Sequence, residues 1–276
     1  MEPQAYKEVG GRIKQARAAM RCCKLCPRHC GVDRTAGQTG FCGLDDSARC
    51  FREMLYYGEE EELTPSHQVY FSGCNLRCEF CTVAEWNEQP MSAPVTDFDN
   101  LCEKIKLRSR NGAITLNLLG GEPSVNLCGI LELLRRMEPS TKVVWNSNMY
   151  YLDVVDELMA GLIDTYVADL KCGSSKCAEA MLGACDYLEV VQKNIVRARR
   201  CSNVIVRHLV MPGHGECCLK PVLKWLAEET PSVKLSLRSN YVPPADAVYS
   251  PKQYVEEKDI KIAIDYAKKL GLNLIK

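Results

Sequence analysis

The sequence predicts an α/β protein whose main part is an incomplete TIM-type barrel, (β/α)6, preceded by a loop-rich cysteine segment. Short runs of β-branched and aromatic residues alternate with stretches of helical period from residue 67 onward. This alternation is typical of parallel strands with helices outside. Six strand–helix units can be counted, fewer than the eight that close a TIM barrel. We therefore expect an open side that admits something large.

The predicted strands and helices follow one another in a regular order. In such folds reactive side chains gather at the C-terminal ends of the strands, so the residues that follow each strand are candidates for a site. Thr96 is placed to cap the first barrel helix, and Asn111-Gly112 to end it. The strands are expected at 69–71, 114–119, 143–145, 166–170, 204–207 and 233–237, and the clearest helices at 98–110, 127–138, 219–230 and 260–270.

The region before the barrel has a different composition. A short helix is expected near residues 5–20, and the stretch 22–50 is poor in apolar periodicity but rich in cysteine, glycine and arginine. Such a composition suits a segment organised by a bound metal. We therefore divide the chain into residues 1–62, an N-terminal helix with a four-cysteine metal-binding segment, and residues 63–276, the barrel. The four glutamates at 59–62 are interpreted as a solvated connector.

Charge and hydropathy exclude several classes of partner. The 35 Lys and Arg residues balance 35 Asp and Glu residues, so the chain lacks the positive field that concentrates polyanions, and we expect no nucleic-acid partner. No stretch approaches the ~20 apolar residues of a membrane span, and the start of the chain is polar. We therefore expect no membrane partner and a cytoplasmic location.

The chain contains 17 cysteines. The number is odd, and a chain of this length does not need disulfide bonds to be stable, so reduced thiols are expected. Reduced thiols serve as metal ligands, as catalytic groups or as small buried apolar groups. Their spacing has to decide between these roles.

One group of cysteines directly follows the first predicted strand. Cys74, Cys78 and Cys81 form the pattern Cys-x-x-x-Cys-x-Phe-Cys. Three thiolates on one short loop can hold three irons of a [4Fe–4S] cluster and leave the fourth iron without a protein thiol. The alternative is a zinc site with a fourth ligand from elsewhere, although zinc sites more often use two Cys-x-x-Cys arms.

This pattern resembles the hallmark of the radical S-adenosylmethionine (SAM) superfamily, in which an aromatic residue precedes the last cysteine. The resemblance implies the radical SAM fold and a [4Fe–4S] cluster whose open iron binds the amino and carboxylate groups of SAM. It also implies reductive cleavage of SAM to a 5′-deoxyadenosyl radical, with an electron donor of the flavodoxin or ferredoxin type. Phe80 would lie against the adenine.

The ends of later strands carry polar groups that agree with this resemblance. Gly120-Gly121-Glu122 follows the second strand and resembles the superfamily's GGE motif, in which backbone and glutamate receive the SAM amino group; an ordinary Gly-Gly strand end is the alternative. A carboxylate, an ammonium and a guanidinium at successive strand ends can bind an amino-acid zwitterion and a ribose, whereas surface ion pairs are the alternative interpretation. These later groups are Asn146, Ser147, Asp169, Lys171, Arg207 and His208.

From residue 23 to its end the chain resembles the PflX group, proteins related to pyruvate formate-lyase activating enzymes. In the activating enzymes an Asp-x-Lys motif and an arginine on strand five contact SAM, which transfers to Asp169, Lys171 and Arg207. Their Asp-Thr-Asn at the end of strand three is matched here by Asn146-Ser147-Asn148, so an amide replaces a carboxylate. His208 replaces an aromatic residue and is expected to hydrogen-bond SAM or substrate.

The N-terminal segment carries a second group, Cys23, Cys26, Cys30 and Cys42, with gaps of two, three and eleven residues. Four protein ligands close a metal site, so this site is expected to be structural or to relay electrons. Zinc and a second iron–sulfur cluster both fit, and Cys22 or Cys50 could replace one ligand. The PflX group shares this pattern.

The remaining cysteines are less regularly spaced. Cys102 and Cys128 lie on apolar helix faces and are expected in the core. The others follow predicted strands four and five and could ligate a further cluster or face the substrate. They include Cys172, Cys177, Cys185, Cys217 and Cys218.

The leading functional hypothesis is an enzyme that cleaves SAM and abstracts hydrogen from a substrate. One branch activates a glycyl-radical enzyme by taking hydrogen from a glycine of a partner protein. The other branch modifies a small molecule or a peptide. A non-catalytic iron–sulfur scaffold or metallochaperone would also explain the many thiols, but it would not explain the polar motifs at successive strand ends.

Overall fold

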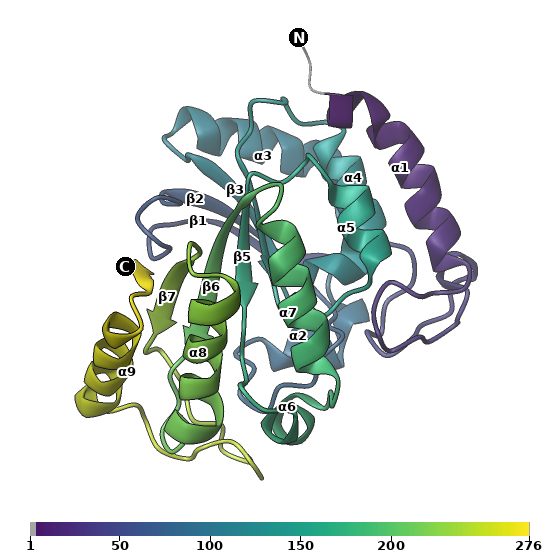
Figure 1. The fold of residues 1–276 in the computed structure, drawn as a ribbon. Coiled ribbons are helices and arrows are strands. Elements are labelled where there is room, and N and C mark those ends of the chain that lie inside the picture. Colours follow the sequence, from purple (N-terminus) through teal and green to yellow (C-terminus); the bar gives the residue numbers. More distant parts are fainter. Residues whose placement is uncertain (1–3, 276) are drawn as a thin grey trace. The chain divides into compact units, whose positions relative to one another are not determined.

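The computed structural model describes residues 4–275 and is drawn in Figure 1. The chain forms two compact units, each assembled from separate segments. The first unit consists of Met1–Asn75, Val83–Ser147 and Tyr151–Thr165, and the second of Leu76–Thr82, Asn148–Tyr150 and Tyr166–Lys276. The functional division at residues 62 and 63 stays a prediction.

The strands form one eight-stranded sheet in the order of the sequence. β1 pairs with β2 in the antiparallel sense, whereas β2 with β3, β3 with β4, β6 with β7 and β7 with β8 pair in parallel. This open, mostly parallel sheet confirms the predicted α/β fold and incomplete TIM-type barrel. The strands are β1 (Cys50–Tyr56), β2 (Ser66–Phe71), β3 (Thr115–Gly120), β4 (Val143–Ser147), β5 (Thr165–Asp169), β6 (Asn203–Leu209), β7 (Lys234–Arg238) and β8 (Asn273–Ile275).

The helices alternate with these strands as the periodicity predicts. All four barrel helices named from the sequence are present, and short 3-10 turns cover Arg34–Ala36, Pro90–Ser92 and Pro123–Asn126. A π-helix, Gly215–Leu219, leads into α8. The α-helices are α1 (Gln4–Met20), α2 (Ala84–Glu88), α3 (Phe98–Arg110), α4 (Leu127–Leu134), α5 (Asp153–Met159), α6 (Ser175–Leu182), α7 (Tyr187–Ala198), α8 (Lys220–Glu229) and α9 (Glu257–Lys269).

The structure corrects three local predictions. Strands β1 and β8 were not predicted, so the sheet has two strands more than the six expected. Asp97, not Thr96, caps α3, because its carboxylate accepts hydrogen bonds from the backbone of the first turn; the helix ends before Asn111 as expected. Glu59 and Glu60 are buried instead of solvated, and the Glu59 carboxylate accepts hydrogen bonds from Gln68 and Asn117.

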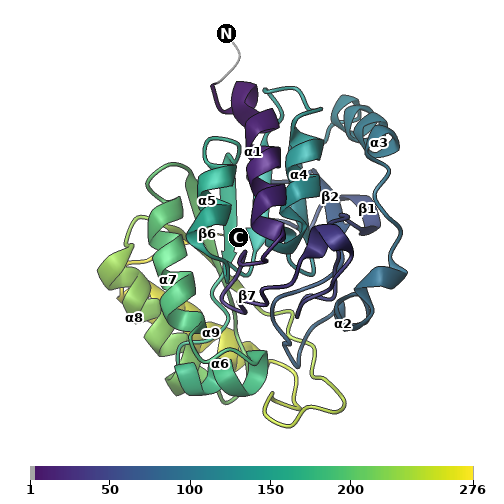
Figure 2. The same cartoon turned by 90° about the vertical axis from the view of Figure 1, so that its right-hand side faces the viewer.

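In the first unit α1 packs alongside α4, as Figure 2 shows. The buried face of α1 consists of Val9, Ile13, Ala16 and Met20. Seven of the eight residues of α4 are buried, because α1 covers the side of α4 that would otherwise face solvent. A helix that is apolar on nearly all sides is typical of such an interior position.

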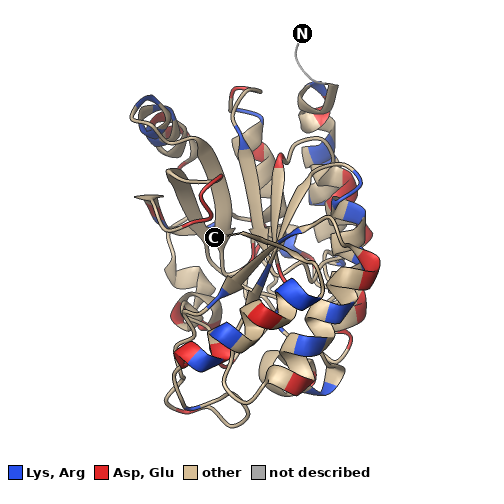
Figure 3. Ribbon diagram, turned by 60° about the vertical axis from the view of Figure 1, so that its left-hand side comes forward, with Lys and Arg blue, Asp and Glu red and all other residues tan. Residues whose placement is uncertain are grey.

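In the second unit α7 contacts β6, and α9 contacts α8, β7 and β8. Basic and acidic residues follow one another along α8 and α9, and Figure 3 shows the same mixture of signs on the helices. Mixed charges of this kind are typical of a solvated helix face. No helix within residues 4–275 is long and apolar enough to cross a membrane.

Candidate functional site

In the first unit the GGE motif hydrogen-bonds to the loop that leads to Cys74. The backbone N–H of Gly121 donates to the carbonyl of Phe71 over 2.7 Å, and the N–H of Glu122 donates to the carbonyl of Gly73 over 2.9 Å. These contacts continue the parallel pairing of β2 with β3 beyond the ends of both strands. The predicted motif residues Gly120–Glu122 therefore lie beside the start of the predicted cluster loop.

The two glycines of this motif are required by the close approach of the backbones. A Cβ atom on Gly120, whose φ is +129°, would lie 2.2 Å from the carbonyl oxygen of Phe71. A Cβ atom on Gly121 would lie 2.2 Å from the carbonyl oxygen of Gly73. Real Cβ atoms do not approach so closely, and only glycine lets the two backbones meet at this distance.

Glu122 and Ser147, which the sequence assigned to one site, are in contact. The Ser147 hydroxyl donates to Glu122 Oε1 over 2.8 Å, and the backbone N–H of Ser124 donates to the same oxygen over 3.1 Å. Glu122 is fully buried, and Asn146 and Ser147 at the end of β4 are buried as well. The carboxylate is thus held in one orientation at the C-terminal edge of the first unit's strands.

In the second unit Cys78 and Cys81 lie on one tight turn. The backbone N–H of Cys81 donates to the carbonyl of Cys78 over 3.1 Å, while Arg77 and Glu79 donate to the last carbonyls of α6 over 3.0 Å each. Both cysteine residues are partly exposed. Cys74 belongs to the first unit and these two cysteines to the second.

The carboxylate of Glu79 anchors a distant segment to this turn. It accepts hydrogen bonds from the backbone N–H groups of Val248, Tyr249 and Ser250, at 3.1, 3.0 and 2.7 Å. These donors hold the pKa of Glu79 below its ordinary value although burial acts in the opposite direction. The ring of Phe80 lies 6.1 Å from that of Tyr241, so residues 241–250 lie over the turn.

Asp169 and Lys171, at the end of β5, form an ion pair with 2.7 Å between Lys171 Nζ and Asp169 Oδ2. Tyr187 fixes the backbone between them, because its hydroxyl donates to the carbonyl of Asp169 over 2.6 Å and accepts from the N–H of Lys171 over 3.1 Å. Burial alone would lower the pKa of Lys171, but the Asp169 carboxylate outweighs it and the pKa is raised. Lys171 therefore stays positively charged.

Lys171 also interacts with the predicted cluster ligand Cys78. Burial raises the pKa of the Cys78 thiol to about 12, and the ammonium of Lys171 acts in the opposite direction. A cation beside a thiol favours its thiolate form, which is the form that binds metal. The structure thus brings Cys78, Cys81, Asp169 and Lys171 together within the second unit.

Arg207 and His208 are neighbours on β6 and point to opposite faces of the sheet. His208 is buried, with Nδ1 2.7 Å from the carbonyl oxygen of Leu170. Burial lowers the pKa of His208 to about 4, so the ring is neutral near pH 7. Since the carbonyl can only accept, Nδ1 carries the hydrogen and donates a hydrogen bond to the Leu170 carbonyl oxygen.

The N-terminal cysteines are gathered as the spacing predicts. Cys23, Cys26 and Cys42 are buried and Cys30 is partly exposed. Burial raises the pKa of the Cys26 thiol to about 12, and the other three thiols contribute to the increase, so all four are electrostatic neighbours. Burial also raises the pKa of Cys50 on β1 to about 11, and the backbone of Arg52 and the charges of Glu53 and Lys104 act on this thiol.

This four-cysteine segment contacts the residues on both sides of Cys74. A Cβ atom on Gly73 would lie 2.9 Å from the carbonyl oxygen of Cys42. On the other side, Arg28 Nε donates to the carbonyl of Asn75 over 2.9 Å. The N-terminal segment therefore packs directly on the loop that carries the first ligand of the predicted cluster.

The structure brings together one further group of possible metal ligands, which includes His214, a residue that was not predicted from the sequence. Cys177, Cys217 and Cys218, which were expected only in general terms to bind a further cluster or face the substrate, surround His214. Cys172 touches the thiol of Cys218. The sequence pattern His-x-x-Cys-Cys at residues 214–218, after β6, could have indicated this group.

Residues 69–226 match the Radical SAM superfamily. The chain is 30% identical over 278 residues to an uncharacterized protein, MJ0674, of Methanocaldococcus jannaschii. The alignment covers 96% of this chain and 79% of the relative.

Solved structures share the fold. Streptococcus suis SuiB bound to precursor peptide SuiA superposes with a TM-score of 0.58 and a sequence identity of 19%. The superposition covers 73% of this chain and 46% of the SuiB chain. A radical SAM methyltransferase from Sphaerobacter thermophilus gives a TM-score of 0.56 and 11% identity, and covers 98% of this chain and 91% of that chain. Members of the superfamily are enzymes that use an iron–sulfur cluster and SAM and need a reductant. Because the superfamily match covers more than half of its residues, this chain belongs to the radical SAM superfamily.

Proposed function

We propose that this protein reductively cleaves SAM at a [4Fe–4S] cluster bound by Cys74, Cys78 and Cys81 and abstracts hydrogen from a substrate. The observation that carries the proposal is the hydrogen bond from Glu122 N–H to the Gly73 carbonyl, 2.9 Å long. It sets the GGE motif beside the loop that leads to Cys74. When bound, the cluster and SAM supply the one-electron chemistry that generates the 5′-deoxyadenosyl radical.

The residues present fit this cofactor pair. Thiolates are the ligands that iron–sulfur clusters require, and Lys171 favours the thiolate of Cys78. The backbone at Gly120 and Gly121 has no room for side chains, so it offers a cradle in which a ligand meets main chain only. Glu122 presents a buried carboxylate of fixed orientation, which suits an ammonium group.

We propose roles for the chain's own residues from the motifs that they match and from the local contacts within each unit. Glu122 and Ser147 receive the amino group of SAM together with Asn146. Asp169, Lys171 and Arg207 bind its ribose and carboxylate, since they offer both signs of charge at strand ends. Phe80 lies against the adenine. His208 hydrogen-bonds SAM or substrate as a neutral ring.

For the N-terminal cysteines we propose a second iron–sulfur cluster that relays electrons. One fact supports this over a structural zinc ion: the segment packs on Gly73 and Asn75, either side of Cys74. The external donor is a low-potential protein of the flavodoxin or ferredoxin type.

For the substrate we propose the activating branch, in which hydrogen is taken from a glycine of a partner glycyl-radical enzyme. The open sheet favours a bulky partner. A small molecule or a peptide is the alternative. It is favoured by Asn146, which replaces the carboxylate of the activating enzymes, and by the superposition on SuiB, which has been solved with a precursor peptide.

The test is the yield of 5′-deoxyadenosine from anaerobically purified protein with SAM and a strong reductant. Cys74→Ala should abolish the yield, and Cys201→Ala, at an exposed thiol, should leave it unchanged. A non-catalytic iron–sulfur scaffold would neither bind nor cleave SAM, and equilibrium dialysis with SAM separates the two hypotheses. An unchanged yield from Cys74→Ala would refute the assignment.

A further inference from the structure

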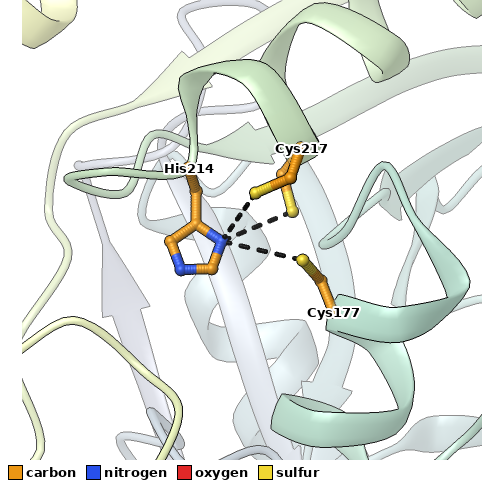
Figure 4. Close-up of side chains that lie close together, drawn as sticks. Cys177, His214 and Cys217 are labelled. Carbon is orange, nitrogen blue, oxygen red and sulfur yellow. Dashed lines mark hydrogen bonds between the residues drawn. The ribbon is translucent and has the colours of Figure 1, made fainter.

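Four side chains of the types that bind metal converge in the second unit, and Figure 4 labels three of them, Cys177, His214 and Cys217. Cys177 comes from the first turn of α6, His214 from the loop after β6, and Cys217 and Cys218 from the π-helix. His214 Nδ1 lies 4.0 Å from the Cys177 sulfur, 3.4 Å from the Cys217 sulfur and 3.6 Å from the Cys218 sulfur. All four ligand atoms lie within 4.8 Å of one another.

Hydrogen bonding to the His214 ring does not by itself explain this convergence, although the Cys217 thiol also hydrogen-bonds to those of Cys177 and Cys218. A neutral imidazole nitrogen has either one hydrogen or one lone pair, so it can serve one thiol and not three. Three thiols around one nitrogen would leave at least two of them without a partner on that ring. A shared cation, by contrast, attracts all four groups to one point.

The spacing fits a single tetrahedral ion. Zinc binds cysteine sulfur at about 2.3 Å and histidine nitrogen at about 2.0–2.1 Å, so a tetrahedral angle places nitrogen and sulfur about 3.5 Å apart. The distances of 3.4, 3.6 and 4.0 Å lie around this value. A multi-iron cluster places each thiolate on a different iron and spreads the sulfurs further.

The local backbone is built to bring these ligands together. The N–H groups of Cys218 and Leu219 both donate to the backbone carbonyl of His214, over 3.0 and 3.1 Å. These bonds close one wide π-turn that begins at His214. Such turns recur at functional sites. The Ser174 hydroxyl caps α6 by accepting from the N–H of Cys177 over 3.2 Å, which fixes the remaining ligand.

The loop after β5 supports the Cys218 ligand. The backbone N–H of Gly173 donates to the sulfur of Cys218, as outer hydrogen bonds to metal ligands commonly do. A Cβ atom at position 173 would lie 2.3 Å from the Cys218 carbonyl oxygen, so glycine permits this approach. Gly173 stands two residues after Lys171 in the chain.

We propose that Cys177, His214, Cys217 and Cys218 bind one zinc ion in a closed structural site. Three thiolates and one imidazole are a typical structural zinc set, and four protein ligands leave no open position. On binding Zn²⁺ the three thiols release three protons, the imidazole binds as the neutral ring through Nδ1, and the site carries one net negative charge. No electron is transferred.

The zinc ion links elements that are far apart in the chain. It joins the first turn of α6 to the π-helix before α8, which lies against Gly173. The site therefore stabilises the loop that carries Asp169 and Lys171. This positional role bears on the proposed SAM contacts, but the zinc site itself does not depend on them.

The test is the zinc and iron content of the full-length protein, purified anaerobically and dialysed against a weak chelator. We expect one zinc ion per chain. Cys217→Ser and His214→Ala should lose it with iron unchanged, and His214→Cys should retain it because it completes a four-cysteine set. Cys201→Ser and Cys172→Ser should retain zinc, since neither thiol belongs to the group. Cys172→Ser is the more stringent control because its thiol touches Cys218.

A spectroscopic measurement keeps the test decisive if a variant does not fold. Replacing zinc with Co²⁺ in the wild-type chain should give the visible bands of a tetrahedral cobalt–thiolate site, shifted in His214→Cys. The proposal fails if these four residues bind iron instead of zinc, or if zinc content is the same in all variants. It also fails if Cys23→Ser removes the zinc, or if intact mass shows a disulfide among Cys177, Cys217 and Cys218. Cys74→Ala should keep the zinc while losing SAM cleavage, so the two proposals fail separately.

Discussion

The backbone N–H of Glu122 donates to the carbonyl of Gly73 across 2.9 Å, and this bond joins the GGE motif to the loop that begins the cysteine pattern. Both residues lie in the first unit. Strands β2 and β3 pair in register up to Phe71 and Gly120, so the contact follows from the pairing of neighbouring parallel strands. The proposed cofactor site therefore rests on backbone geometry as well as on side chains.

Gly121→Ala should separate these two loops. The new Cβ would lie 2.2 Å from the Gly73 carbonyl oxygen, so the backbone must shift. We expect the yield of 5′-deoxyadenosine to fall about tenfold or more, since misplacement of a binding group by about 1 Å is sufficient for such a loss. Gly11→Ala, where a Cβ meets nothing within 4 Å, is the matched control. Equal yields from both variants would disprove the role of the close approach.

Ser147→Ala should weaken SAM binding and also lower the free energy of unfolding. It removes one of the hydrogen bonds to the buried Glu122 carboxylate, which is 2.8 Å long, and the loss of a hydrogen bond to a charged group costs about 1.5–3 kcal/mol of stability. Because the carboxylate is then no longer held in one orientation, Kd for SAM should rise by about tenfold or more. Isothermal titration with SAM measures this, and Ser92→Ala at an exposed turn serves as control. An unchanged Kd would remove Ser147 from the site.

His208 should make the protein less stable in mild acid. The unfolded chain takes up a proton as pH falls below about 6.5, whereas the folded protein, with a His208 pKa of about 4, does not. The stabilisation is complete above pH 6.5 and is lost as pH falls towards 4. Between pH 7 and 5 the free energy of unfolding should fall by about 2 kcal/mol more in the wild type than in His208→Gln. Urea titrations at both pH values measure the difference; parallel falls would contradict it.

Cys26→Ala should distinguish an electron relay from a structural metal site. If the N-terminal cluster passes electrons to the SAM cluster, 5′-deoxyadenosine formation with reduced flavodoxin should fall about tenfold or more, corresponding to ~1.4 kcal/mol or more. A small reductant such as dithionite can bypass the relay and should restore most of the yield. Cys22→Ala, at an exposed thiol, is the control. Equal losses with both reductants would indicate a structural role.

The sequence predicted most of the fold because strands and helices alternate with clear periodicity. The two strands that it missed lack this signal. β1 carries Arg52 and Glu53 and is only half-buried at the sheet edge, and β8 is three residues long. Glu61 and Glu62 are exposed as predicted, but Glu59 was misinterpreted because Gln68 and Asn117 satisfy its carboxylate in the interior, which a local pattern does not reveal.

The candidate site could be predicted where its ligands are close in sequence. The cysteines at 74, 78 and 81 were predicted from their spacing and the GGE motif from its resemblance to that of the superfamily. The structure brings Gly121 and Glu122 against Phe71 and Gly73, while the cluster and SAM assignments stay proposals. The contact of Ser147 with Glu122 was expected only in outline, because it depends on how β4 pairs with β3. Cys177, Cys217 and Cys218 were expected only as possible ligands of a further cluster, and His214 was missed, since Cys177 and His214 are 37 residues apart and no repeated spacing links them.

The central claim is tested most directly by electron paramagnetic resonance of the reduced, anaerobically purified protein with and without SAM. We predict a [4Fe–4S] signal that changes when SAM is added and that is absent from Cys74→Ala, while any signal from the N-terminal cysteines remains. A signal that SAM leaves unchanged, or one that Cys74→Ala retains in full, would contradict the proposed cluster site.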